Sequence, residues 1–161
     1  MLVMMGTGEA EPRATTLTLE DVYRRERAHL VRLARMMVGS TVIAEEIVHD
    51  AFVRLEAAWE RVDVPGAYVR TIVVNLCRTW LRRDHRATGA LPAAERPVLE
   101  PELDETWSVV QRLPEKYRVV LALRFYEDMA EVDIAEVLGC RAGTVRSRVH
   151  RGLDLLRKEL S

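Results

Sequence analysis

The chain has 161 residues, of which 48% are hydrophobic and 30% are charged, and its formal net charge is -1. This length allows one domain or two small ones, and the composition is that of a globular protein. No apolar run approaches the roughly 20 residues that a membrane-spanning helix needs, which excludes a transmembrane helix. Residues 1–16 lack the features of a signal peptide, and we interpret them as a disordered tail.

The two cysteines, Cys77 and Cys140, lie far apart in the sequence, and neither belongs to a CxxC pair. This pattern is typical of a reducing cytoplasm and argues against a thiolate zinc site. We therefore expect a cytoplasmic protein that needs no metal or other cofactor.

Helical periodicity runs through the first half of the chain, and no segment has the alternation of a strand. Thr18 and Asp21 resemble a capping box, which begins a helix that ends at Gly39. Thr41 is expected to cap a second helix, and Pro65 to lie in the first turn of a third that runs to about Arg86. The predicted inward residues are Tyr23, Leu30, Leu33, Ala34 and Met37, then Ala44, Val48, Ala51, Phe52, Leu55 and Trp59, then Val69, Ile72, Leu76 and Trp80.

The composition then changes over residues 89–101, where Pro92, Pro97 and Pro101 indicate a flexible linker. A second helical block follows it, and one of its helices is expected to begin at Leu113-Pro114. Its predicted apolar residues are Leu103, Trp107, Val110, Tyr117, Val120, Leu121 and Phe125. We predict an all-α protein with two small helical domains, residues 17–88 and residues 102–161.

The stretch from Glu131 to Arg151 has the pattern of a helix-turn-helix, with Gly139 at the turn. Its first helix has the apolar residues Ile134, Ala135 and Leu138, and its second has Val145, Val149, Gly152, Leu153, Leu156 and Leu160. Between Arg141 and Arg151 there are four arginines and no acid. This charge balance suits a recognition helix that approaches phosphates and base edges, although a solvated arginine-rich helix is the ordinary alternative.

Three side chains of this second helix, Ser147, His150 and Arg151, point away from its apolar face together with Arg146. Arg146 could bind a guanine through two hydrogen bonds. Gly143 has no side chain, so the start of the helix could press against a phosphate.

Two further helix faces are not explained by packing alone. The outward face of the second helix combines Ile43 and Val53 with Glu46 and Asp50, which suggests a docking surface, although a solvated face with scattered aliphatic residues is common. On the third helix, one polar side carries Thr71, Asn75, Arg78 and Arg82. Thr and Asn can read base edges, and Arg can contact phosphates or stack on bases.

An enzymatic alternative rests on two Glu-x-x-His pairs, Glu26 with His29 and Glu46 with His49, because di-iron bundles use such pairs. We reject it because Glu46 points away from the buried face of its helix and cannot line a bundle interior. The sequence contains no nucleophile–base pair and no phosphate-binding glycine loop. We therefore expect a protein that is not an enzyme.

Together these motifs resemble the sigma-70 family of bacterial RNA polymerase initiation factors, and within it the short extracytoplasmic-function (ECF) group. The resemblance rests on AEEIVHDAFVRL at residues 44–55, AYVRTIVVNLCRTWLRR at residues 67–83, and the long stretch over residues 113–157. It implies a factor that binds core RNA polymerase and directs promoter-specific initiation. The implied partners are promoter DNA, the clamp helices and flap of the polymerase, and, as for many members, an anti-sigma protein.

The resemblance also implies roles for individual residues. Glu46, His49 and Asp50, with Ile43 and Val53 beside them, match the surface that docks on the clamp helices of the largest polymerase subunit. The matches to the segment that engages the -10 element are Asn75, Arg78, Arg82 and Arg83, to which we add Thr71, and the loop Arg61 to Gly66 would form a pocket for a flipped base. The residues that match the helix reading the -35 element are Thr144, Arg146, Ser147, His150 and Arg151, to which we add Gly143 and Arg148.

The chain departs from the family pattern at four positions, one of which is Asp133 in place of the usual Glu. His49 stands where the family usually has Gln, so the affinity for the clamp could vary with pH. Ala130 and Arg141 stand where Ser is frequent, so both helices of the helix-turn-helix are expected to lack a side-chain cap, at a typical cost of ~1 kcal/mol each.

Two other classes of function compete with this interpretation. A helix-turn-helix regulator that binds duplex DNA without polymerase would need neither the acidic-aliphatic face of the second helix nor the polar side of the third. An all-α interaction protein with no role in DNA binding would leave the arginine run without acids unexplained.

Overall fold

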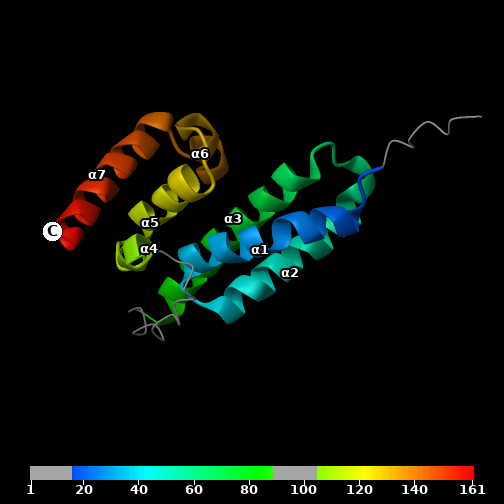
Figure 1. The fold of residues 1–161 in the computed structure, drawn as a ribbon, viewed down its shortest axis with the longest axis horizontal. Coiled ribbons are helices and arrows are strands. Elements are labelled where there is room, and N and C mark those ends of the chain that lie inside the picture. The colour runs from blue at the N-terminus through cyan, green and yellow to red at the C-terminus, as the bar shows by residue number, and fades with distance from the viewer. Residues whose placement is uncertain (1–15, 89–104) are drawn as a thin grey trace, which may run out of the picture.

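The computed structural model describes residues 16–88 and 105–161, and every regular element in these ranges is helical, which confirms the all-α prediction (Figure 1). Residues 1–15 and 89–104 lie outside the described ranges, so the disordered tail, the flexible linker and the inward position of Leu103 stay predictions. Within the described part of the chain, no helix is both long enough and apolar enough to cross a membrane.

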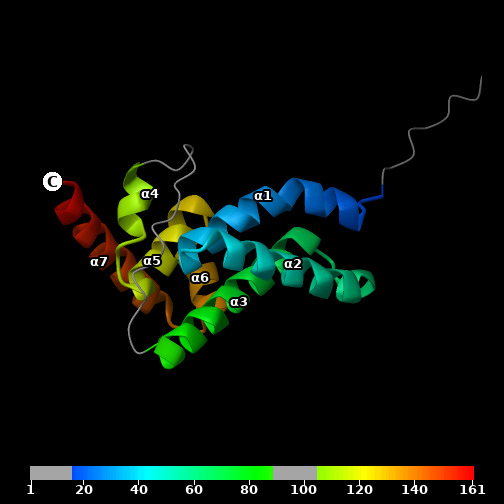
Figure 2. The ribbon, with the colours of Figure 1, turned by 90° about the horizontal axis from the view of Figure 1, so that it is seen from below.

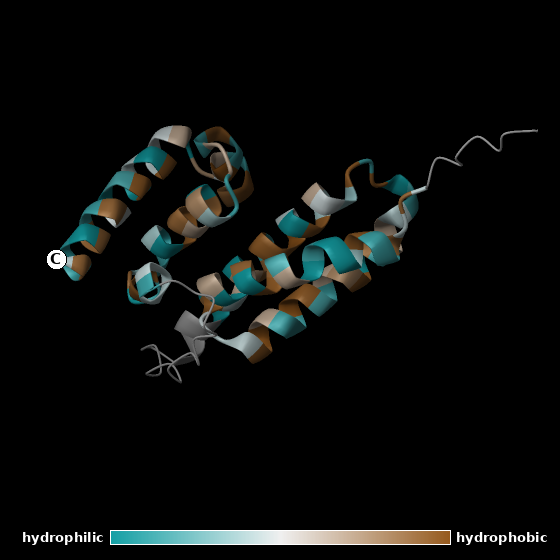
Figure 3. Cartoon of the chain, viewed as in Figure 1, coloured by the Kyte–Doolittle hydropathy of each residue, from teal (hydrophilic) through white to brown (hydrophobic). Residues whose placement is uncertain are grey.

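Three long helices form the N-terminal unit: α1 (Leu19–Val38), α2 (Thr41–Ala58) and α3 (Pro65–Thr88), with a 3-10 turn (Trp59–Arg61) after α2. They lie side by side along much of their length (Figures 1 and 2). Each contributes one apolar face to a shared core, and the residues that are almost wholly inaccessible include Leu30, Leu33, Met37, Val48, Leu55, Val69, Val73 and Leu81. Figure 3 shows the hydrophobic bands of these helices beside hydrophilic bands of the opposite faces.

The ends of α1 follow the sequence prediction. The backbone N–H of Asp21 donates to Thr18 Oγ1 at 3.2 Å, and that of Thr18 donates to Asp21 Oδ2 at 3.0 Å, which completes a capping box. Gly39 ends the helix in the left-handed region, with φ 79°. The prediction for α2 was wrong by one residue, because Ser40 has the extended backbone of a cap and accepts from Ile43 N at 3.3 Å, whereas Thr41 is already helical.

Two predictions about the core of this unit need correction. Tyr23 is 41% exposed and its ring forms a T-shaped pair with that of Phe52, whereas the neighbouring Val22 is buried. On α3 the fully buried residues are Val69, as predicted, and Val73, Val74, Cys77 and Leu81, whereas the predicted Ile72, Leu76 and Trp80 are half-buried. The reason is that α3 packs against both α1 and α2, so its buried face is broader than one stripe, and the predicted residues lie at its rim.

The C-terminal unit contains α4 (Glu105–Val110), α5 (Glu115–Leu121), a π-helical turn (Ala122–Tyr126), α6 (Glu131–Leu138) and α7 (Ala142–Leu160). Gly139, with φ 64°, makes the turn between α6 and α7. Val120, Leu121, Leu123, Ile134 and Val145 are buried in its core.

Two residues predicted to be inward in this unit are exposed: Phe125 at 52% and Leu160 at 51%. The π-helical turn after α5 changes the helical register, which directs Phe125 to solvent. Leu160 lies in the last turn of α7, where a helix end is least covered. As predicted, neither Ala130 nor Arg141 supplies a side-chain cap to the helix that it precedes.

The two units contact each other: α1 packs against α5 and the π-helical turn, and α3 packs against α6 (Figures 1 and 2). Arg118 of α5 is buried at this contact and donates to the backbone oxygen of Met37, at the end of α1, at 2.7 Å.

Two glycines of α7 should respond in opposite ways to a larger side chain. A Cβ on Gly152 would lie 3.1 Å from Leu121 Cδ1 and 3.3 Å from Tyr117 Cβ, whereas a Cβ on Gly143 would meet nothing within 4 Å. We expect Gly152→Val to lower the free energy of unfolding by about 1–3 kcal/mol through overpacking between α5 and α7. Gly143→Ala should raise it by up to about 1 kcal/mol through helix propensity. Urea unfolding followed by circular dichroism measures both, and equal changes in the two variants would contradict this packing.

Candidate nucleic-acid interface

The predicted docking surface lies on the outer face of α2. Glu46, His49 and Val53 are exposed, and Ile43 and Asp50 are partly exposed. Asp50 is held by an exposed ion pair with Arg54 one turn later, at 3.3 Å. The acids and aliphatic side chains of this face therefore all reach solvent, as a docking surface requires.

Val42 extends the same face and was missed by the sequence analysis, although it is 65% exposed. The signal was available, because a helical advance of about 100° per residue places Val42 roughly beside Val53 and opposite Val48. We define the α2 face as Val42, Ile43, Glu46, His49, Asp50 and Val53.

The polar side of α3 is present in the structure, but not all of its side chains are exposed to solvent. Thr71, Asn75, Arg82 and Arg83 are exposed, and Arg78 is partly buried. Arg78 NH1 donates to the backbone oxygen of Val137, in the last turn of α6, at 3.4 Å. One arginine of this predicted DNA-contacting set is thus engaged by the C-terminal unit.

A hollow of about 510 Å³ opens where the loop after α2 meets the first turns of α3. It is lined by Arg61, Val62, Asp63, Val64, Ala67, Tyr68, Thr71 and Ile72. The loop predicted to form a base pocket does line it, and Thr71 connects it to the polar side of α3. The exposed Tyr68 was missed, and it offers a ring on which an unstacked base could stack.

The helix-turn-helix presents α7 with its arginines outward. Arg146, Ser147, His150 and Arg151 are exposed, and Thr144 and Arg148 are partly exposed. A second hollow, of about 370 Å³, lies between α7 and the start of α5. It is lined by Lys116, Tyr117, Gly143, Thr144, Ser147, Arg148 and Arg151.

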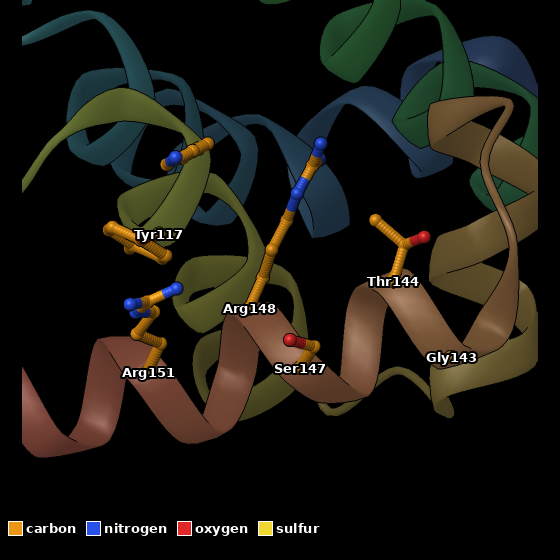
Figure 4. A pocket seen from close by; sticks show the side chains of 7 residues that line it. Tyr117, Gly143, Thr144, Ser147, Arg148 and Arg151 are labelled. Carbon is orange, nitrogen blue, oxygen red and sulfur yellow. The ribbon is translucent and has the colours of Figure 1, made fainter.

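Figure 4 shows Arg148 and Arg151 extending from α7 toward α5, with Tyr117 opposite Arg151. Lys116, which the sequence analysis missed, brings a third cation to this hollow from α5, and its Nζ lies 5.0 Å from the centre of the Tyr117 ring. Three cations and a glycine beside a helix start favour a phosphate group at this place.

Arg146, which is predicted to read a base, forms an ion pair within the protein in the absence of DNA. Its Nε lies 3.0 Å from Glu131 Oε2, so it bridges α7 to the start of α6, and its side chain is still 63% exposed. An exposed pair of this kind contributes little to stability, so a base edge can displace Glu131.

The structure also bears on the two Glu-x-x-His pairs. Glu46 and His49 lie on the exposed α2 face, whereas His29 of α1 contacts Glu127 of the C-terminal unit. In residues 16–88 and 105–161, no three metal-ligating side chains come together.

Comparison with known sequences identifies two regions of one family. Residues 22–87 match the family described as Sigma-70 region 2, and residues 103–156 match the family described as Sigma-70, region 4. The RNA polymerase sigma-E factor of Streptomyces coelicolor is 32% identical over 155 residues, which cover 89% of this chain and 86% of that protein. The ECF RNA polymerase sigma factor SigW of Bacillus subtilis is 28% identical over 165 residues, which cover 87% and 86% of the two proteins.

The fold is also that of a solved structure, the sigma factor RpoE in complex with the anti-sigma factor NepR from Bartonella quintana. The TM-score is 0.67 at 21% identity, and the match covers 88% of this chain and 97% of RpoE. With two sigma regions in order along one chain and relatives matched over most of their length, the chain belongs to the ECF group of the sigma-70 family.

Proposed function

We propose that this protein is an ECF sigma factor, which binds core RNA polymerase in the cytoplasm, directs it to specific promoters and catalyses no reaction itself. The observation that carries the proposal is the α2 face, because its acids and aliphatic side chains all reach solvent and, apart from Ile43, do not pack against the core. A regulator that binds duplex DNA alone has no use for such a face, so that alternative is not favoured.

The α2 face is proposed to dock on the clamp helices of the largest polymerase subunit. Its aliphatic members, Val42, Ile43 and Val53, supply the apolar area, and Glu46 and Asp50 supply the charge that fixes orientation and suppresses wrong partners.

The surfaces on α3 and α7 are proposed to contact the promoter at two places. Thr71, Asn75, Arg78, Arg82 and Arg83 would engage the -10 element as a single strand, with one flipped base in the hollow beside Tyr68. For the -35 element in the major groove, the proposed residues are Gly143, Thr144, Arg146, Ser147, Arg148, His150 and Arg151. Lys116 joins them as a phosphate contact.

The direct test is run-off transcription with purified core polymerase of the same organism and a promoter library. We expect addition of this chain to produce transcripts from a defined subset of the library, with a shared -10 and -35 sequence, and core enzyme alone to produce none from that subset. Absence of both a stable complex and new start sites would refute the proposal.

Glu46→Lys is expected to weaken binding to core polymerase at least tenfold, or ~1.4 kcal/mol, because a reversed charge meets a surface complementary to an acid. Binding of the full chain to a duplex carrying the -35 element should not change. The matched control is Glu45→Lys, an equal charge change at an exposed residue about 100° around the same helix. Titration of labelled core enzyme measures the affinity, and equal losses in the two variants would show that the α2 face is misplaced.

Arg146 and Lys116 should differ in what their loss does to DNA binding. Arg146→Ala is expected to relax base preference at one position of the -35 element by roughly 1–3 kcal/mol. Lys116→Ala should weaken binding to all sequences alike and reduce the salt slope by about 1. Binding-site selection and salt titration measure these effects, and an unchanged preference in Arg146→Ala would exclude Arg146 as a reader.

A further inference from the structure

We propose that Glu127 is a latch that holds the C-terminal unit closed on α1 and α3, and that this closed state competes with promoter DNA for Arg78. The competition, but not the latch itself, rests on the proposed function.

Glu127 lies directly after the π-helical turn, and its side chain is only 7% exposed. Its Oε2 contacts His29 Nε2 of α1, and its Oε1 accepts from Arg70 NH1 of α3 at 3.3 Å. Both partners belong to the N-terminal unit, so one buried carboxylate joins three elements from two halves of the chain. A carboxylate that is withdrawn from water needs such partners.

The residue before Glu127 strengthens the same contact. The Tyr126 ring stacks on His29, with 4.7 Å between ring centres and 10° between planes, and Tyr126 OH donates to His29 O at 3.4 Å. Trp107 meets the Tyr126 ring edge-on at 6.0 Å. His29 is therefore held through its ring face, its ring nitrogen and its backbone oxygen by two adjacent residues of the other unit.

Two further arginines join the units by binding helix ends. Arg118 donates to Met37 O in the last turn of α1, and Arg78 donates to Val137 O in the last turn of α6. The last carbonyls of a helix lack intrahelical partners and carry partial negative charge, so a cation is favourable there. Each unit thus supplies an arginine to a helix end of the other.

The closed state affects the proposed -10 surface directly. Arg78 NH1 is engaged by Val137 O and α6 packs on α3 beside it, so a phosphate can approach Arg78 only through its remaining N–H groups and past α6. Thr71, Asn75 and Arg82 stay exposed. DNA can therefore reach only part of the α3 surface until the C-terminal unit moves away.

The latch should also respond to pH. The hydrogen bond that the His29 ring donates to the Glu127 carboxylate raises the pKa of His29 above its usual 6.5, with a smaller contribution from Glu26. Burial and the nearby Arg32 oppose this rise, and Tyr126 and Arg70 also face the site. Because the closed state binds the proton of the His29 ring more tightly than the open state does, the contribution of His29 to closure is fully present below pH 6.5. That stabilisation is lost as pH rises through the raised pKa.

Single-molecule energy transfer on the full chain can measure closure without polymerase or DNA. Dyes on Glu45→Cys in α2 and Glu159→Cys in α7, both exposed positions, report the separation of the units. Cys140→Ser removes the partly exposed thiol, and Cys77 can remain because burial raises the pKa of its thiol to about 12. We expect a predominantly closed population at pH 6.

Glu127→Gln should raise the open-to-closed ratio about tenfold or more, since it removes the charge from two buried hydrogen bonds. The matched control is Asp128→Asn, the same change at the next residue, whose side chain is 96% exposed, and it should stay within twofold of the parent. Arg70→Gln tests the same contact from the other unit, and circular dichroism verifies that each variant is folded. The latch is refuted if the parent is open at pH 6, or if Glu127→Gln and Arg70→Gln both keep the parent ratio.

The pH dependence is tested by measuring the open fraction as a function of pH in two variants. His29→Asn should abolish the rise of the open fraction with pH, whereas the control His49→Asn should retain it. Persistence of the pH response in His29→Asn would exclude His29 as the titrating group.

The competition is tested by stopped-flow association with core polymerase bearing a -10 single strand. If the open state is the competent one, the rate for Glu127→Gln rises by the same factor as its open fraction. Equal rates for parent and variant despite different open fractions would refute competition. Failure of every variant to bind core would instead refute the proposed function, and the energy-transfer result would still decide the latch.

Discussion

The arrangement of the functional surfaces depends on the apolar core that α1, α2 and α3 share. Each helix can bury one face, and once Val48 and Leu55 of α2 and Val73 and Leu81 of α3 are fixed in that core, the opposite faces are fixed as well. The α2 face is thereby directed to solvent on one side, while the polar side of α3 and the hollow beside Tyr68 lie on another. A polymerase subunit and a DNA strand can therefore be held by neighbouring helices of one unit, in a geometry that does not depend on either partner.

The local distribution of charge, rather than the net charge of the chain, determines how it interacts with DNA. The formal net charge is -1, yet residues 68–88 carry five arginines and one acid. Screening limits each charge to neighbours within about 10 Å, so DNA meets the local patch rather than the net charge. The structure adds that some arginines are already paired: Arg70 of this patch with Glu127, and Arg146 of α7 with Glu131. For Arg146, the proposed DNA contact would exchange one anionic partner for another, which would lower the affinity for arbitrary sequence and leave a larger share of the free energy to base contacts.

Local signals in the sequence predicted the fold well, because they act over a few residues. Capping at Thr18, termination at Gly39 and the start of α3 at Pro65 all depend on neighbours within one turn. The errors arose where two neighbouring residues can play the same role or where tertiary structure intervenes. Ser40 and Thr41 can both cap a helix, and the π-helical turn that exposes Phe125 has no simple sequence signature. The partner of His29 lies 98 residues away, and periodicity cannot indicate a contact of that kind.

The chemistry of the contact between the units suits an association that must be reversible. An apolar interface would leave hydrophobic surface in water whenever the units separate, which would make closure hard to undo. Here the groups that join them include a carboxylate, arginines and helix-end carbonyls, all of which water can solvate after separation. For buried ion pairs the attraction is largely offset by the cost of desolvation, so these polar groups add only a small net free energy to closure. A small net value is what allows a partner of ordinary affinity to shift the equilibrium, because a ligand can move a population only by its differential affinity for the two states.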